Sequence, residues 1–88
     1  DHEYDMKQIP VKAGNPFAGV FYEKVFFDLK KACNVILIGV VKAENGTRKL
    51  IKNPEGSVKI EMGDYLVLLM DRKGEDRLKK HFHIEEGV

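Results

Sequence analysis

The pattern of apolar and polar positions is clearest between Leu50 and Met70, and the rest of the chain must pack against this stretch. Val58, Ile60 and Met62 alternate with charged residues, and a period of two predicts a strand. The run from Tyr65 to Met70 is almost wholly apolar and too short for a typical helix. We therefore expect this run to form a strand that is buried on both faces.

Turn-forming residues separate the predicted strands. Asn53-Pro54 ends a strand from Arg48 to Lys52, because proline lacks a backbone donor and restricts the residue before it. Gly63-Asp64 predicts a tight turn, since glycine adopts backbone conformations that branched residues resist. Asn45-Gly46 is a strong signal for a β-hairpin between two strand-like runs.

Two further strands are expected in the first half of the chain. Cys33 to Ala43 is the most hydrophobic run and is rich in β-branched residues. Gly39 within it indicates a bulge or a close approach of another backbone segment. Asp1 to Lys12 alternates weakly, and its Pro10 suits an edge strand, where no ladder donor is needed.

One main helix is predicted from Phe17 to Ala32, where apolar residues recur at spacings of three and four. Lys30 and Lys31 suit the negative end of its dipole. Four of the chain's five phenylalanines lie between Phe17 and Phe27, so the apolar stripe is wide for so short a helix. Two interpretations stay open: the whole stripe is core, or one side faces the sheet and the other faces a partner.

The end of the chain is expected to hold a polar turn from Asp71 to Gly74 and a short helix from Glu75 to His81. The predicted order is therefore β-α-β-β-β-β with a short C-terminal helix. This is an α+β domain with one main helix and a small, mostly antiparallel sheet.

Length, composition and charge restrict the class of protein. The chain of 88 residues is one small domain, 1–88, and its hydrophobic content of 43% is enough for a core. Fifteen Lys and Arg against fourteen Asp and Glu argue against a nucleic-acid partner, which needs a basic excess. No apolar run is long enough to span a bilayer, so no direct membrane insertion is expected. The chain begins at Asp1, and we expect it to be a fragment of a longer protein.

No residue set predicts an enzyme. The chain has neither a Gly-rich phosphate loop nor a G-x-S-x-G turn, and Cys33 has no histidine near it in the sequence. His81 and His83, followed by Glu85 and Glu86, could contact a metal, but metal motifs bring more ligands at stricter spacing, so a solvated tail is favoured. Which residues would bind a metal is therefore unknown from the sequence. Asp64 is interpreted as a turn-former rather than a cation ligand.

Several short motifs occur in an order and at a spacing that resemble the C-terminal subdomain of RCK domains, the TrkA-C type. This family supplies regulatory domains of prokaryotic potassium channels and transporters. The resemblance covers about Tyr4 to Phe82. The motifs are the Asn15-Pro16-Phe17-Ala18-Gly19 entry to the first helix, Val35-Ile36-Leu37-Ile38 after its charged end, Asn45-Gly46, Pro54 and Gly63-Asp64.

The resemblance implies a cytoplasmic regulatory, ligand-sensing and dimerising domain that controls potassium flux, as part of a membrane-associated channel or transporter. It implies a homodimer through the side of the helix from Phe17 to Ala32. The implied effector is a small molecule or ion, with cyclic di-AMP and calcium as the candidates. The rival hypothesis is a purely structural oligomerisation module without a ligand.

The resemblance also implies where a ligand would bind. Some members of the family bind cyclic di-AMP at the dimer interface through an asparagine followed by apolar residues, and Asn34, Val35 and Ile36 match that pattern. Asn53 and Pro54 are the expected neighbours from the loop, and Lys30 or Lys31 would offset the ligand's charge. The alternative is structural: Asn34 ends the helix in a left-handed conformation.

Overall fold

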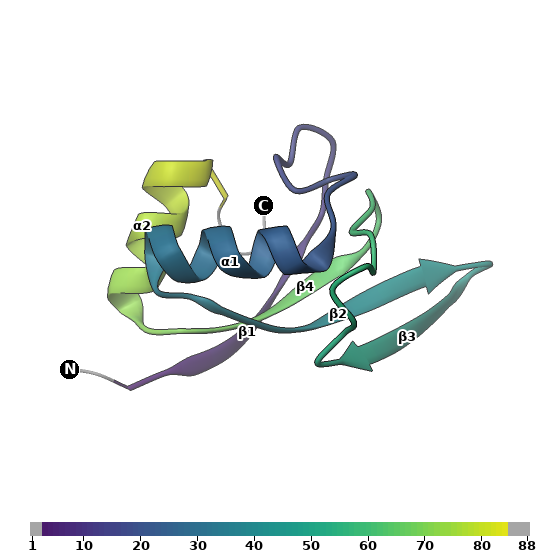
Figure 1. Ribbon diagram of the computed structural model, residues 1–88, viewed down its shortest axis with the longest axis horizontal. Coiled ribbons are helices and arrows are strands. Elements are labelled where there is room, and N and C mark those ends of the chain that lie inside the picture. Colours follow the sequence, from purple (N-terminus) through teal and green to yellow (C-terminus); the bar gives the residue numbers. More distant parts are fainter. Residues whose placement is uncertain (1–2, 85–88) are drawn as a thin grey trace.

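The computed structural model describes residues 3–84, which form one four-stranded sheet with two helices packed on one of its faces (Figure 1). All strand pairs are antiparallel, in the order β1-β4-β2-β3, so β4 lies in the interior of the sheet although it is the last strand in the sequence. The α+β class and the antiparallel sheet predicted from the sequence are confirmed. The elements are β1 (Asp5–Pro10), α1 (Tyr22–Cys33), β2 (Ile36–Glu44), β3 (Thr47–Lys52), β4 (Tyr65–Met70) and α2 (Arg72–Phe82).

The core lies between the sheet and the helices. Leu37 of β2 is paired with Leu68 of β4, and both side chains are fully buried beneath α1 and α2. Val67 is also buried although it lies on the opposite face of β4, whereas Tyr65 and Leu69 on that face are partly exposed. The almost wholly apolar sequence of β4 therefore reflects an interior strand whose two faces are both largely covered.

Gly39 is the site of a bulge in β2, as predicted. The pairing register of β2 with β4 shifts between Leu37 and Gly39. A Cβ atom at Gly39 would lie 3.0 Å from the backbone oxygen of Ile51, so glycine permits the close approach of β3.

The predicted strand through Val58, Ile60 and Met62 is wrong. This segment makes one isolated bridge, between Phe21 and Lys59, and does not join the sheet. Its backbone bonds instead go to the chain that leads into α1: Ile60 N–H donates to the Val20 carbonyl at 2.9 Å. The alternation is real because Ile60 is buried, but the partner of the segment is a loop rather than a strand.

The main helix begins later than predicted. α1 starts at Tyr22, because Gly19 has a φ of +83°, which an α-helix cannot contain. Phe17 is nevertheless buried, in the turn before the helix. The Tyr22 hydroxyl donates a hydrogen bond to the Leu37 carbonyl, which joins the start of α1 to β2.

The predicted polar turn from Asp71 to Gly74 is also wrong, because α2 already begins at Arg72. Asp71 is its N-cap, and its Oδ1 accepts a hydrogen bond of 2.8 Å from the Gly74 N–H. A Cβ atom at Gly74 would lie 2.9 Å from Cγ2 of Val35, so this glycine lets α2 pack closely against the start of β2. A turn-like composition here encodes a capped and closely packed helix start.

Asp64 is a buried turn residue with a second role. Its Oδ2 accepts a hydrogen bond of 2.8 Å from the Glu61 N–H, as expected of a turn-former, and a bond of 2.5 Å from the Lys42 ammonium. Burial lowers the pKa of Lys42, but hydrogen bonds to Asp64 and Glu61 outweigh it, so the pKa lies above its ordinary value of 10.5. The ion pair attaches the loop before β4 to β2.

Candidate ligand site at the end of α1

The left-handed interpretation of Asn34 is confirmed. Asn34 has a φ of 56° and is the C-cap of α1. Its N–H donates to the Lys30 carbonyl at 3.1 Å, and the Val35 N–H donates to the Leu29 carbonyl at 3.2 Å. These two bonds end the helix and turn the chain directly into β2.

The Asn34 side chain lies exposed at this junction and is held from two sides. The Lys30 ammonium donates to its Oδ1 at 2.7 Å, and its Nδ2 donates to the Tyr4 hydroxyl at 3.3 Å. Tyr4 precedes β1, so the sequence contains no local signal for this contact. The amide is oriented by its neighbours and remains accessible to solvent.

The structure separates the predicted site residues by accessibility. Val35 is fully buried, and its N–H is used in the helix cap, so neither its side chain nor its amide faces solvent. Ile36 is partly exposed and is paired with Leu69, on the sheet face that points away from the helices. Of the three residues in the motif, Asn34 and Ile36 are the two that a ligand can reach.

Asn53 and Pro54 lie in the loop that follows β3, beside a point further along β2. The Asn53 N–H donates to the Ile38 carbonyl at 2.9 Å, two residues beyond Ile36 in β2. Asn53 is exposed and has a φ of 44°, whereas Pro54 is buried. The structure therefore places the loop beside β2, but not at the same point as Asn34.

The end of α1 is electrically suited to an anion only because of its lysines. The last turn of a helix carries partial negative charge, which repels anions. Lys30 and Lys31 occupy this turn, and both are exposed. Lys31 also lies 5.6 Å above the ring of Phe27, a cation–π contact that places the ammonium beside an exposed aromatic surface.

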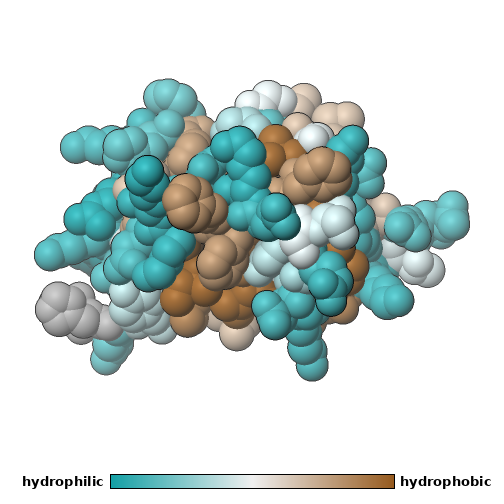
Figure 2. Space-filling view, in the orientation of Figure 1, coloured by the Kyte–Doolittle hydropathy of each residue, from teal (hydrophilic) through white to brown (hydrophobic). Residues whose placement is uncertain are grey.

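The interpretation that the whole apolar stripe belongs to the core is wrong, and a partner on its exposed side stays a prediction. Tyr22, Val25 and Leu29 are core, while Phe21 and Phe27 keep 51% and 61% of their surface exposed. Figure 2 shows apolar residues gathered in the middle of the face that carries α1, surrounded by hydrophilic residues. Exposed aromatic side chains on one helix are the usual chemistry of a protein interface.

The described residues offer no metal cluster and no activated thiol. Within residues 3–84 no group of three His, Cys, Asp or Glu side chains could hold a metal ion. His81 and His83 are exposed, and Glu85 and Glu86 lie outside the described residues. Burial raises the pKa of the Cys33 thiol more than the charge of Arg77 lowers it, so the reactive thiolate is disfavoured.

Neither α1 nor α2, the helices of the described range, is long and apolar enough to cross a membrane.

Comparison with known proteins identifies the fold through structure and not through sequence. No protein-family model and no curated protein matches the chain. Among solved structures, the RCK_C domain dimer of S. agalactiae BusR in complex with c-di-AMP aligns with a TM-score of 0.66 and 19% identity, over 89% of this chain and 95% of that chain. The chain therefore has the fold of an RCK C-terminal domain, as the sequence resemblance implied.

Two further structures place this fold within longer chains. BusR in complex with its busA promoter DNA aligns with a TM-score of 0.68 and 19% identity, over 91% of this chain. The RCK domain of GsuK aligns with a TM-score of 0.66 and 13% identity, over 88% of this chain. The alignments cover only 37% of that BusR chain and 16% of the GsuK chain.

The exclusion of nucleic acid from the expected partners is wrong. It rested on the formal net charge of +1 of this chain alone. A protein that contains a domain of the same fold, BusR, is solved in complex with promoter DNA. The charge of one domain therefore does not decide whether a protein built with this fold contacts DNA.

Proposed function

We propose that this chain is a regulatory domain that dimerises and binds cyclic di-AMP, acting through binding and not through catalysis. The observation that carries the proposal is the exposed, oriented amide of Asn34 at the α1–β2 junction, in a fold similar to that of a c-di-AMP-bound RCK_C dimer. The asparagine provides both a donor and an acceptor to a nucleotide, and Lys30 and Lys31 offset phosphate charge.

The proposed mechanism is differential binding. A two-fold symmetric dinucleotide placed between two copies would meet one Asn34 and one Lys30 from each. Binding exchanges the intrachain contact of Asn34 with Tyr4 for contacts with the ligand, and favours the arrangement of the two copies in which both sites face each other. Calcium is the other candidate effector.

We propose potassium flux through a channel or transporter as the output, based on the resemblance of the motifs to the RCK family. The domain would then belong to the part of a membrane-associated protein that lies in the cytoplasm. The promoter complexes of BusR favour a second output, in which a domain of this fold regulates a DNA-binding segment of the same chain. Both outputs share the ligand-binding step, which can be tested on this chain directly.

The first prediction is that Asn34→Gly weakens cyclic di-AMP binding by about 1 to 3 kcal/mol, or roughly 5- to 150-fold. Glycine retains the left-handed backbone that Asn34 adopts and removes only the amide. Calorimetric titration of the wild type and the variant with cyclic di-AMP, and separately with calcium, measures the effect.

The matched control is Asn45→Gly, which makes the same replacement at another left-handed asparagine, in the β2–β3 turn. This control should bind like the wild type. If the wild type binds neither compound, the structural oligomerisation module is the better account. Equal binding by Asn34→Gly would instead mean that the ligand site lies elsewhere.

The second prediction concerns the dimer face. Phe27→Ser should weaken self-association roughly tenfold or more, because each copy would no longer bury an aromatic ring. Leu50→Ser is the control, since Leu50 is an exposed apolar residue on β3, away from α1. Sedimentation velocity over a range of concentrations gives both constants. A dimer weakened by Leu50→Ser and not by Phe27→Ser would place the interface on the sheet.

A further inference from the structure

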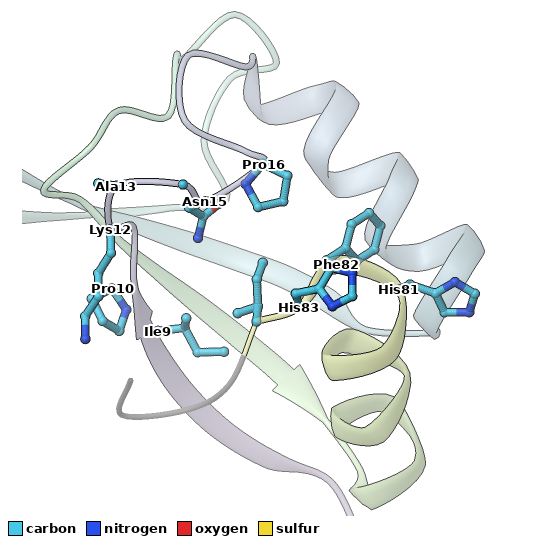
Figure 3. A pocket seen from close by; sticks show the side chains of 11 residues that line it. Ile9, Pro10, Lys12, Ala13, Asn15, Pro16, His81, Phe82 and His83 are labelled. Atoms are coloured by element: carbon cyan, nitrogen blue, oxygen red, sulfur yellow. The ribbon is translucent and has the colours of Figure 1, made fainter.

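A cavity of about 390 Å³ lies between the loop that follows β1 and the end of α2 (Figure 3). Its volume is within the range typical of small-molecule sites. None of its lining residues belongs to the candidate site at the end of α1. It is therefore a separate feature of the fold.

Local contacts hold the two walls of the cavity in place. In the loop, the Asn15 N–H donates to the Lys12 carbonyl at 3.0 Å, and Asn15 Oδ1 accepts from the Phe17 N–H at 2.8 Å. The rings of Phe17 and Phe82 pack with centroids 4.9 Å apart, which joins the loop to α2. Across the cavity, His83 adopts a φ of 58° and turns the chain so that Ile84 is buried.

The lining combines an apolar floor with cationic and amide groups. Ile9, Phe82 and Ile84 supply apolar surface. Asn15 uses its oxygen in the loop, which leaves its Nδ2 as a donor, and Figure 3 shows this side chain pointing into the opening. Lys12 is exposed at the edge, with no ion pair in the part of the chain that the structure describes.

The charge of the lining selects the sign of a ligand. Lys12 is a fixed cation, and His83 lines the wall opposite Asn15, whereas His81 points away from the cavity (Figure 3). No Asp or Glu occurs among the lining residues within 3–84. Among the described lining residues, an anionic group would therefore meet the Lys12 ammonium and the Asn15 donor and no carboxylate.

We propose that this cavity binds a small organic anion with a flat apolar body, as a second effector site of the domain. The ring would lie on Ile9, Phe82 and Ile84, and its carboxylate would accept a hydrogen bond from the Asn15 amide. The Lys12 side chain, which runs beside Pro10 in Figure 3, would turn its ammonium toward the carboxylate from the edge. The site provides one lysine, which matches a single anionic group on the ligand.

The test uses 2-naphthoate as the probe and the full 88-residue chain. Titration followed by ¹⁵N–¹H correlation spectra should shift the backbone amides of the lining residues, including Ile9, Asn15 and Ile84. 2-Naphthylmethanol, which has the same ring and no charge, should bind about tenfold more weakly. Equal binding of the two probes would contradict an anion site.

Lys12→Gln should weaken 2-naphthoate binding about tenfold and leave 2-naphthylmethanol unchanged, since it removes only the charge. Lys73→Gln is the matched control, because Lys73 is exposed on α2 and does not line the cavity. The spectrum of each variant reports directly whether it is folded. The proposal fails if lining amides do not shift at millimolar probe, or if Lys12→Gln and Lys73→Gln bind equally. Neither result bears on Asn34.

Discussion

Lys42→Met is expected to lower the free energy of unfolding by about 3 to 5 kcal/mol. Lys42 donates to Asp64 at 2.5 Å and to the Lys59 carbonyl at 2.9 Å. Asp64 is only 2% exposed, so the variant would leave a buried carboxylate whose remaining partner is the Glu61 N–H. Methionine matches lysine as far as Cε and lacks only the ammonium, so the loss measures the charge of that group together with its hydrogen bonds. Urea denaturation followed by circular dichroism gives the value.

Three controls define this result. Lys52→Gln removes an exposed lysine of β3 and should change stability by less than about 0.5 kcal/mol. Adding Asp64→Asn to Lys42→Met should recover much of the loss, since no charge then remains buried.

The contribution of Lys42 to stability should also depend on pH. Because folding raises the pKa of Lys42, this contribution is complete below its ordinary pKa of 10.5 and disappears as pH rises through the raised value. A loss below 1 kcal/mol at neutral pH would contradict the role of the pair.

Leu68→Ala is expected to destabilise the domain by about 2 to 5 kcal/mol. Leu68 is fully buried in the interior strand β4, opposite Leu37, so the truncation removes buried apolar contacts and leaves a cavity. For a domain of this size, such a loss lowers the melting temperature by at least about 8 °C.

Leu50→Ala is the matched control for Leu68→Ala. It makes the same truncation on β3, where Leu50 is 48% exposed, and should cost well below 2 kcal/mol. Both variants replace leucine by alanine within a strand, so strand propensity changes equally in the two. The difference between their melting temperatures therefore measures the effect of burial. Similar losses for the two leucines would contradict the position of β4 in the core.

The sequence predicted β2 and β4 well because a short, β-branched apolar run with turn residues at its ends has few alternatives to a buried strand. Asn45-Gly46 likewise forms the expected β2–β3 turn. The start of α1 was missed because periodicity continues through Phe17 while the φ of Gly19 interrupts the helix. Periodicity reports which side of a segment is buried, not how its backbone is bonded.

The same limit explains the wrong strand around Ile60. Its alternation shows one buried side, but its hydrogen-bond partners, Gly19, Val20 and Tyr22, are distant in the sequence. Polar contacts that join distant segments were likewise not predictable. From the sequence we interpreted Asp64 as a turn residue, but its carboxylate also accepts a hydrogen bond from Lys42, which lies in β2.

For the candidate site, the motif resemblance predicted the position of Asn34 but not the geometry around it. Helix-end statistics suggested its left-handed backbone. They contain nothing about Tyr4, which contacts Asn34 across 30 positions of the sequence. Nor could the motif distinguish the buried Val35 from the accessible Ile36, because accessibility depends on how α2 packs over the start of β2.

The measurement that tests the central proposal most directly is sedimentation velocity of the wild-type chain with cyclic di-AMP, recorded at the adenine absorbance. The chain contains no tryptophan and three tyrosines, so absorbance at this wavelength comes mainly from the nucleotide. The account predicts that the nucleotide sediments with a species of twice the 10.0 kDa chain mass, at one nucleotide per two chains. Nucleotide that stays free while the chain sediments as a monomer would contradict it.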